Sequence, residues 1–345
     1  MMLNKKLLLE LVKIPAPSGL EYLMKDYLLK YGKENLKNTD VIFEGGEVYF
    51  IKKSNNPNAK SVLFDAHMDN VSLRIMSITD DGFLICRSFG LNDEDIYGKE
   101  VNVLTKNGII NGVISINPPH LNIKNNQLIV DIFAKNGEEA KYLVEIGDAI
   151  FYKPYAKIVN GHLSGTFLDN HIGVYSLINL AKMIDEIENI KYNIIFHFSS
   201  REETGNLKYL SMLPQNEEKI SRKIQLIFVV DADLATDVYN LNRDDLPKSY
   251  LGKGPIISRN IIDDYNVYKF LMSIMDDIPY QTVMSDGNGG NNLIDYNKLN
   301  VYGQSIGIPL RYMHSSVETC RLDDIKWTIQ LLYNIVLNLD IFFSQ

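Results

Sequence analysis

Three apolar runs of strand length, each followed closely by acidic residues or a histidine, constrain the fold of this chain most strongly. Residues 62–64 run into Asp65-Ala66-His67, residues 194–198 are soon followed by Glu202-Glu203, and residues 224–230 are followed by Asp231. Unbroken apolar runs suit central strands that are covered on both faces. In an open α/β sheet, the loops at the carboxyl ends of the strands meet in one crevice. We therefore expect an α/β fold that gathers these polar side chains at one edge of its sheet.

Two further potential ligands stand near element ends. Asp169 precedes an amphipathic helical pattern between residues 174 and 184, and His314 follows the β-like run 306–313. Asp169 could instead cap that helix, although Asn170 or Thr166 could also take the capping role. Two divalent ions could share one carboxylate and would then lie about 3.5–4 Å apart. Two histidines and three carboxylates suit such a centre: His67, Asp169, Glu203, Asp231 and His314.

Two other carboxylates suggest how such a centre would work. Glu202 and Glu203 are adjacent beyond a strand end, so one can bind metal while its neighbour faces a water molecule, and Glu202 is the candidate general base. A solvated acidic loop is the alternative interpretation. Asp69 lies two residues after His67, where a carboxylate can accept the second imidazole N–H and orient the ring. The alternative for that pair is a surface ion pair.

The remaining histidines are weaker candidates. His197 lies inside a predicted strand and is interpreted as a core residue. His120 and His162 fall in predicted turns or loops, and His171 is only a neighbour of Asp169.

Composition excludes several classes of protein. A net charge of −8 argues against nucleic-acid binding, because phosphate contacts call for a basic face. Only two cysteines occur, Cys86 and Cys320, which favours the reducing cytoplasm over a disulfide framework. No run approaches 18 uncharged apolar residues, and the N-terminal segment has no small-residue cleavage site, so neither a membrane span nor a signal peptide is expected.

The pattern along the chain predicts two domains. Residues 71–157 alternate short apolar runs with turn signals and contain one helix-like segment, 138–144, which is typical of a small β-rich domain. On either side, residues 1–70 and 158–345 show α/β alternation and form the predicted catalytic domain. We expect Asn4 to cap a helix at 7–12, Ser18 and Glu21 to form a capping box, and a helix over 322–339 to close the domain.

Several motifs, in order, resemble the tetrahedral and glutamyl aminopeptidases, a family of dinuclear metallo-aminopeptidases that includes members labelled endoglucanases. The resemblance covers almost the whole chain. Its motifs are Ile14-Pro15-Ala16-Pro17-Ser18-Gly19-Leu20-Glu21, Ala66-His67-Met68-Asp69, Gly112-Val113-Ile114 through Pro119-His120-Leu121, Leu168-Asp169, Glu202-Glu203-Thr204-Gly205, Asp231 through Asp237, and Ile308-Pro309-Leu310-Arg311-Tyr312-Met313-His314-Ser315.

This resemblance implies a phosphorylase/hydrolase-like α/β/α zinc-peptidase domain with an inserted PDZ-like dimerisation domain. It implies two divalent ions, Zn²⁺ or else Co²⁺, one held by His67 and Asp231 and the other by Glu203 and His314, with Asp169 bridging. It also implies that Asp69 orients His67, that Glu202 is the general base, and that the substrates are short peptides. Homo-oligomers, either dimers or dodecamers, are expected.

The chain departs from the family pattern around these motifs, at Asn70, Asn170, His171 and the segment 285–292. These departures leave a second hypothesis open: a homologue with little or no activity that acts as an assembly or binding subunit. A third, a glycosidase using paired carboxylates, leaves His67 and His314 unexplained.

Overall fold

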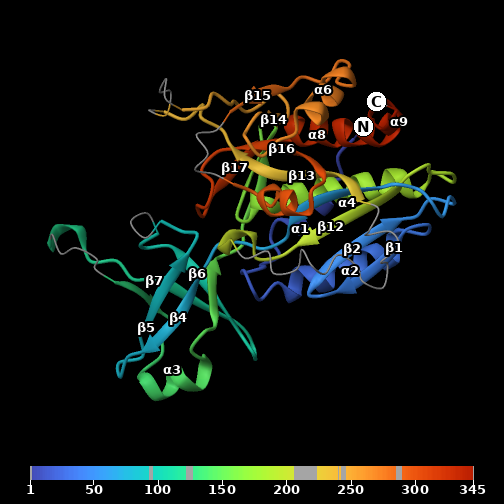
Figure 1. Cartoon of the computed structure of the whole chain (residues 1–345). Coiled ribbons are helices and arrows are strands. Elements are labelled where there is room, and N and C mark those ends of the chain that lie inside the picture. The colour runs from blue at the N-terminus through green and yellow to red at the C-terminus, as the bar shows by residue number, and fades with distance from the viewer. Residues whose placement is uncertain are drawn as a thin grey trace.

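The computed structural model describes residues 2–92, 96–121, 127–205, 224–239, 241, 246–284 and 290–344. Its larger part is built on an eight-stranded mixed sheet, seen above and to the right of a smaller β-rich part in Figure 1. The strand order is β1 (Asp40–Glu44), β2 (Glu47–Lys52), β12 (Asn193–Ser199), β3 (Ser61–His67), β13 (Ile224–Leu234), β16 (Tyr302–Leu310), β14 (Ile256–Ser258) and β15 (Gln281–Val283).

The four central strands, β12, β3, β13 and β16, run parallel, so their carboxyl ends point to the same edge. All residues of β3 and β12 are buried, as their apolar runs predict. Val229 of β13 pairs with Asp65 of β3, so Asp231 comes level with His67 across the two strands. The sheet therefore sets two of the expected ligands side by side.

Helices cover this sheet on both faces. Alternate apolar residues of the central strands share one large core with α1 (Lys5–Leu11), α2 (Tyr22–Asn35), α4 (Leu168–Asp185), α6 (Tyr265–Ser273), α8 (Leu322–Leu337) and α9 (Leu339–Phe343). The opposite face carries a smaller core that includes Leu63, Ile195 and Ile227 and is covered by α7 (Leu293–Tyr296). This is the expected α/β architecture.

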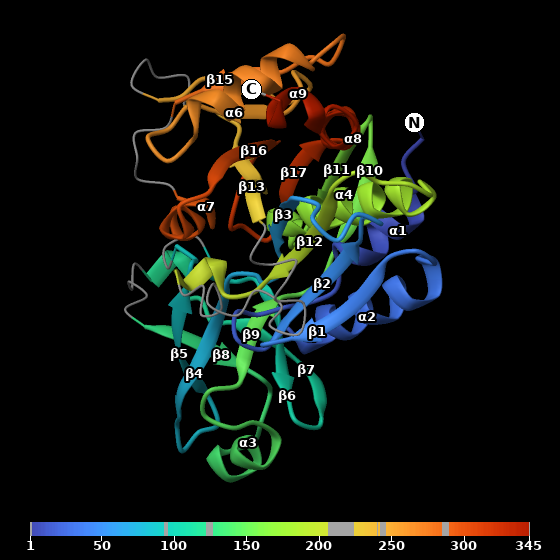
Figure 2. The same cartoon turned by 45° about the vertical axis from the view of Figure 1, so that its right-hand side comes forward.

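The β-rich part is a closed barrel of six strands, and all of them fall within the predicted insert. They are β4 (Ser72–Ile78), β5 (Leu84–Phe89), β8 (Leu128–Asp131), β7 (Gly108–Ile114), β6 (Glu100–Thr105) and β9 (Ala149–Tyr152), in barrel order. Helix α3 (Gly137–Leu143) lies at the end of the barrel away from the large sheet (Figure 2). The division into an inserted domain at 71–157 and its PDZ-like character remain predictions.

After the barrel the chain forms a three-stranded sheet, β10 (Ala156–Val159), β11 (His162–Gly165) and β17 (Glu318–Arg321), in that order. Strand β17 carries the chain from the His314 turn back to α8. The cysteines Cys86 and Cys320 are both buried and free. Within the described ranges, no helix has both the length and the apolar character needed to cross a membrane.

The two predicted caps at the N-terminus have different outcomes. Asn4 caps α1, where its side chain accepts the Leu7 N–H at 3.1 Å. The predicted capping box at Ser18 and Glu21 is wrong, because α2 has no side-chain cap and the Ser18 hydroxyl instead donates to Asp69 Oδ2 at 2.5 Å. In a capping box the serine oxygen would instead accept a backbone N–H at the start of the helix.

Candidate metal centre

His67 lies at the centre of the cluster. Its Nε2 is 3.2 Å from Asp231 Oδ1 and 3.3 Å from Asp169 Oδ1, and the imidazole is 2% exposed. His67 is the last residue of β3, whereas Asp231 lies inside β13, which continues to Leu234 instead of ending before the aspartate as expected. Ligand atoms of these three residues lie within 4.8 Å of one another, close enough to hold one cation.

A second triad shares Asp169 with the first. His314 Nε2 lies 3.2 Å from Glu203 Oε2 and 3.4 Å from Asp169 Oδ2. His314 is in the turn after β16, with φ at 60°, and Glu203 belongs to a short 3₁₀ helix, Glu202–Thr204, after β12. The two oxygens of Asp169 thus face different histidines. All five residues predicted from the sequence to bind metal are brought together.

Asp169 does not cap the helix that follows it. Asp169 and Asn170 have non-helical backbone angles, and Asn170 Oδ1 accepts the Gly173 N–H at 3.1 Å. Asn170 therefore takes the capping role, and the Asp169 carboxylate is left facing the cluster.

Asp69 anchors the turn that carries both glutamates. Its carboxylate accepts the backbone N–H groups of Glu202 and Glu203, at 3.0 and 3.2 Å. His67 Nδ1 is nearer to the Asp69 carbonyl oxygen, at 3.2 Å, than to the carboxylate, at 3.5 Å. The side chain of Asp69 thus holds the turn, and its backbone carbonyl is the closer partner of the imidazole.

Glu202 lies beside the first triad, with Oε2 3.8 Å from His67 Nε2. Burial, reinforced by the charge of Asp231, raises the pKa of Glu202 to about 9. Burial also raises the pKa of Glu203 to about 7. Although burial opposes it, contacts with Asp169 and Glu203 raise the pKa of His314 to about 11, and Asp231 and Glu202 likewise raise the pKa of His67.

The donor set fits divalent ions. All the donors are imidazole nitrogens or carboxylate oxygens, which suit first-row metals. The second oxygen of Glu203, Oε1, is buried and has no hydrogen-bond partner among the described residues, a costly arrangement unless a cation satisfies it.

Glu318, which was not singled out from the sequence, holds two of the ligands in place. One of its oxygens accepts the N–H groups of Leu168 and Asp169, at 2.6 and 3.1 Å, and the other accepts the His314 N–H at 2.8 Å. It is 3% exposed at the start of β17. Its position four residues after His314 is the only local signal, and the partners of its carboxylate are set by the tertiary fold.

Three residues that depart from the family pattern, Asn70, Asn170 and His171, make neutral polar contacts with the backbone. Asn70 Nδ2 donates to the Asp169 carbonyl at 3.0 Å, and Asn170 Nδ2 donates to the Val230 carbonyl at 2.8 Å. His171 Nε2 lies 3.1 Å from the Met68 carbonyl, and burial lowers the pKa of His171 to about 4, so it is a neutral donor there. These residues support the backbone around Asp169.

The segment 285–292, which departs from the family pattern, is described only in part. Residues 285–289 lie outside the described residues, whereas Asn292 is buried and donates to Asp65 Oδ2 at 2.7 Å and to Ser199 Oγ at 2.8 Å.

His197, predicted to be a core residue, is 4% exposed, and its Nδ1 is 2.6 Å from the Tyr296 hydroxyl. His120 and His162 take no part in the metal-type groups found among the described side chains.

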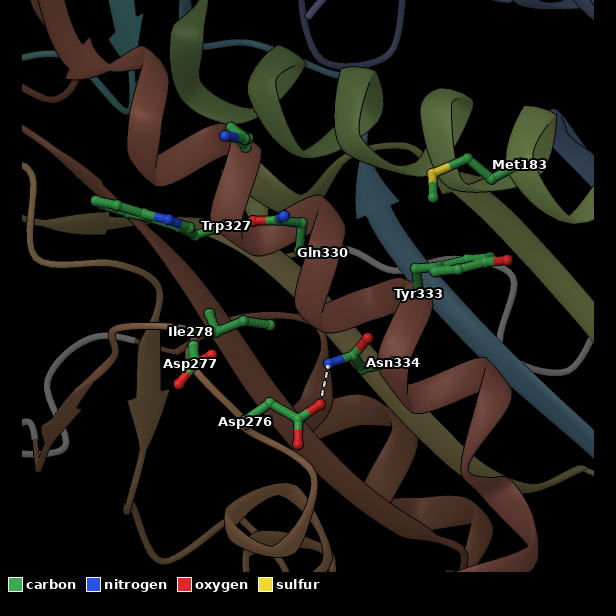
Figure 3. A pocket seen from close by; sticks show the side chains of 9 residues that line it. Met183, Asp276, Asp277, Ile278, Trp327, Gln330, Tyr333 and Asn334 are labelled. Carbon is green, nitrogen blue, oxygen red and sulfur yellow. Dashed lines mark hydrogen bonds between the residues drawn. The ribbon is translucent and has the colours of Figure 1, made fainter. Parts of the chain in front are cut away.

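A cavity of about 420 Å³ opens from the cluster along β13 and β16. Beyond the metal-type residues, its wall includes Asp233, which was not expected as a site residue. A separate hollow of about 450 Å³ lies over the outer side of α8, between Trp327, Tyr333 and the 276–278 turn (Figure 3). It shares no lining residue with the cluster.

The sequence profile of the M42 glutamyl aminopeptidase family matches residues 46–331. The chain belongs to this family. The chain is also 27% identical to lysyl aminopeptidase from Pyrococcus furiosus, over 96% of both chains. As a member of the M42 family it is a hydrolase that acts on peptide bonds.

Solved structures agree with this membership. The TET1 peptidase of Pyrococcus horikoshii, described as assembling into a tetrahedron or a large octahedral shell, is 26% identical with a TM-score of 0.79, covering 96% of this chain and 98% of that one. An aminopeptidase from Desulfurococcus kamchatkensis is 26% identical with a TM-score of 0.84, covering 96% of this chain and 93% of that one. The α/β fold of this M42 chain is thus that of the tetrahedral aminopeptidases.

Proposed function

We propose that this chain is a dinuclear metal-dependent aminopeptidase that removes N-terminal residues from short peptides. The observation that carries the proposal is the pair of ligand triads that share Asp169. One ion would be held by His67 and Asp231, the other by Glu203 and His314, with Asp169 between them. Zn²⁺ is favoured, and Co²⁺ is the alternative, because mixed nitrogen and oxygen ligands do not decide among first-row metals.

When bound, two such ions supply Lewis-acid polarisation of the scissile carbonyl and lower the pKa of water from 15.7 towards about 7. We assign the proton transfer steps to Glu202. As general base it takes the proton of the attacking water and returns it to the leaving amine. Burial raises the pKa of Glu202 to about 9. Nearby positive charge would lower that pKa towards neutrality, where a general base is most effective.

Asp69 would act as a positioning residue. Because its carboxylate accepts the N–H groups of both Glu202 and Glu203, it sets the proposed base and a proposed ligand in one fixed relation. The acidic groups near the metals could also hold the α-amino group of the peptide. Such a contact would restrict cleavage to the N-terminal residue.

Assembly is part of the proposal. We propose that residues 71–157 form a dimerisation domain and that the protein is a cytoplasmic homo-oligomer, either a dimer or a dodecamer. Large apolar side chains on this part are well exposed, among them Phe133 at 69% and Ile146 at 70%. Size-exclusion chromatography with light scattering distinguishes a monomer from either assembly.

The activity is tested with metal-loaded protein, a panel of aminoacyl chromogenic amides, and Glu202→Gln. We expect the substitution to lower kcat about 10²- to 10⁴-fold while bound metal, measured by elemental analysis, stays unchanged. Glu188→Gln, which removes an exposed charge far from the cluster, is the matched control. Metal retained by the wild type with no turnover of any amide would favour the assembly-subunit hypothesis, and failure to take up metal would contradict both.

A further inference from the structure

We propose that Asp233 makes the cavity beside the cluster a pocket for a cationic side chain, so that the enzyme prefers peptides with N-terminal lysine or arginine. This inference rests on the proposed aminopeptidase function and names its substrate class. It starts from the strand that carries both aspartates. Asp231 and Asp233 are two residues apart in β13, so their side chains leave the same face of the sheet. Asp231 belongs to the cluster, while Asp233, two residues further along β13, lines the wall of the cavity.

Only one oxygen of the Asp233 carboxylate accepts a hydrogen bond from the described residues. Its Oδ1 accepts the Leu234 N–H at 2.8 Å, but its Oδ2 has no donor among the described residues. Nearby Asp263, by contrast, accepts bonds from Ser258 Oγ at 2.5 Å, Asn260 N at 2.7 Å, Ser305 N at 2.9 Å and Gln304 Nε2 at 3.1 Å. The Asp233 side chain is half-buried on the wall of the cavity, so its free oxygen is open to a cationic group that enters there.

Nothing on the described wall of the cavity supplies that cation. No lysine or arginine occurs among its described lining residues, and the charged groups that act on Asp233 include further carboxylates, those of Asp231 and Asp263. The carboxylates that would bind metal are neutralised by their ions, but Asp233 is outside both triads. Apolar groups on the same wall, Ile262 and Val283, suit the methylene stem of a long basic side chain.

The backbone makes room for this carboxylate. A Cβ placed on Gly307 would lie 2.6 Å from Asp233 Cβ and 2.8 Å from its Oδ2. Glycine at this position of β16 therefore lets the Asp233 side chain lie across the neighbouring strand, on the floor of the cavity.

The test compares substrates that differ only in the terminal charge. Lysyl and norleucyl chromogenic amides are assayed with metal-loaded wild type and with Asp233→Asn, and binding of free L-lysine and L-norleucine is measured by calorimetry. We expect wild type to favour lysine over norleucine by about tenfold or more in kcat/KM and in affinity, and Asp233→Asn to remove that preference. Asp295→Asn, which removes a carboxylate that pairs with Lys298 and does not line the cavity, should keep the preference.

Two results would overturn the inference. If wild type turns over norleucyl and lysyl amides equally and binds both amino acids equally, the aminopeptidase function stands without its cationic preference. Alternatively, Asp233→Asn lowers kcat/KM by the same factor for both amides, which assigns the carboxylate to the α-ammonium group common to all substrates. A wild type that hydrolyses no amide contradicts the proposed function itself, and calorimetry then still decides whether the pocket selects lysine.

Discussion

At the scale of single residues, Glu318 links parts of the site that are far apart in sequence. Its two oxygens hold the backbone at the start of α4 and at the His314 turn, and so fix the separation of two proposed ligands. Groups that orient metal ligands commonly change metal affinity by about 10–100-fold when they are removed. Glu318 is therefore a positioning residue whose effect reaches the metals through Asp169 and His314.

We expect Glu318→Gln to weaken Zn²⁺ binding by about 10–100-fold, because the amide turns an N–H towards a backbone N–H that needs an acceptor. Competition titration with a chromogenic chelator measures this affinity. Asp185→Asn is the matched control, since Asp185 is also buried and accepts two backbone N–H groups, those of Lys37 and Asn38, at 2.8 Å each. The control should lower the melting temperature and leave metal affinity unchanged; an equal loss of affinity in both variants would reduce Glu318 to a general stabilising role.

The sequence was informative about residues whose neighbours in sequence reveal them. His67, Glu202 and Glu203 follow apolar runs, and their strands deliver them to one place. Glu318 has no such signal, because its partners come from α4 and from the His314 turn. Asp233 does have one: Asp231-Ala232-Asp233 alternates with the period of a strand, so a strand continuing past residue 230 would have placed both aspartates on one face.

At the scale of elements, the pattern of apolar residues predicted where the central strands lie better than it predicted the residues at which they end. Strand β13 runs on to Leu234 because β16 pairs with it along that length, and this pairing is not visible in either segment alone. Strand β6 gives a weaker signal in the sequence, because it mixes Glu100 and Asn102 with its apolar residues. The capping box failed at Ser18 because Asp69, distant in sequence, competes for the hydroxyl.

Helix α2 packs so closely on the sheet that one glycine is required. A Cβ on Gly32 would lie 2.7 Å from both Phe50 Cε1 and Val41 Cγ2. Alanine normally stabilises a helix by about 1 kcal/mol over glycine, but overpacking a buried contact costs about 1–3 kcal/mol. We expect Gly32→Ala to lower the free energy of unfolding by about 1–2 kcal/mol in urea titrations. Lys33→Ala, exposed on the same helix, should change it by less than about 0.5 kcal/mol, and a stabilised Gly32→Ala would show that the sheet yields easily.

At the scale of the whole molecule, the cluster couples stability to pH. Burial raises the pKa of Glu202 to about 9, of Glu203 to about 7 and of Glu318 to about 8, from about 4.5 in the unfolded chain. The folded protein thus holds more protons than the unfolded chain across this range, and its stability falls as pH rises. His314, with its pKa raised to about 11, acts in the same direction: its contribution is complete below about pH 6.5 and is lost as pH rises towards 11.

We therefore expect the melting temperature of metal-free protein to fall between pH 6 and pH 9. Metal displaces these protons, so saturating Zn²⁺ should raise the melting temperature more at pH 8 than at pH 6. At a free metal concentration a thousandfold above Kd, the gain is about 4 kcal/mol. Scanning calorimetry with and without chelator provides the measurement. A metal-free melting temperature that rises over this range, or a metal effect independent of pH, would contradict the proton-for-metal exchange.

The path of the chain between the two parts limits where its length can change. It leaves the large sheet after His67, at the end of β3, and passes through Asp69 and Asn70 into the barrel. It returns near Tyr155 into the three-stranded sheet, where Phe151 of the barrel packs on Phe167, two residues before Asp169. A residue added at either crossing would shift a ligand-bearing segment, whereas the same addition at the distant Asp81-Gly82 turn of the barrel would not. Natural variation in loop length should therefore accumulate at the far end of the barrel and be rare at the two crossings.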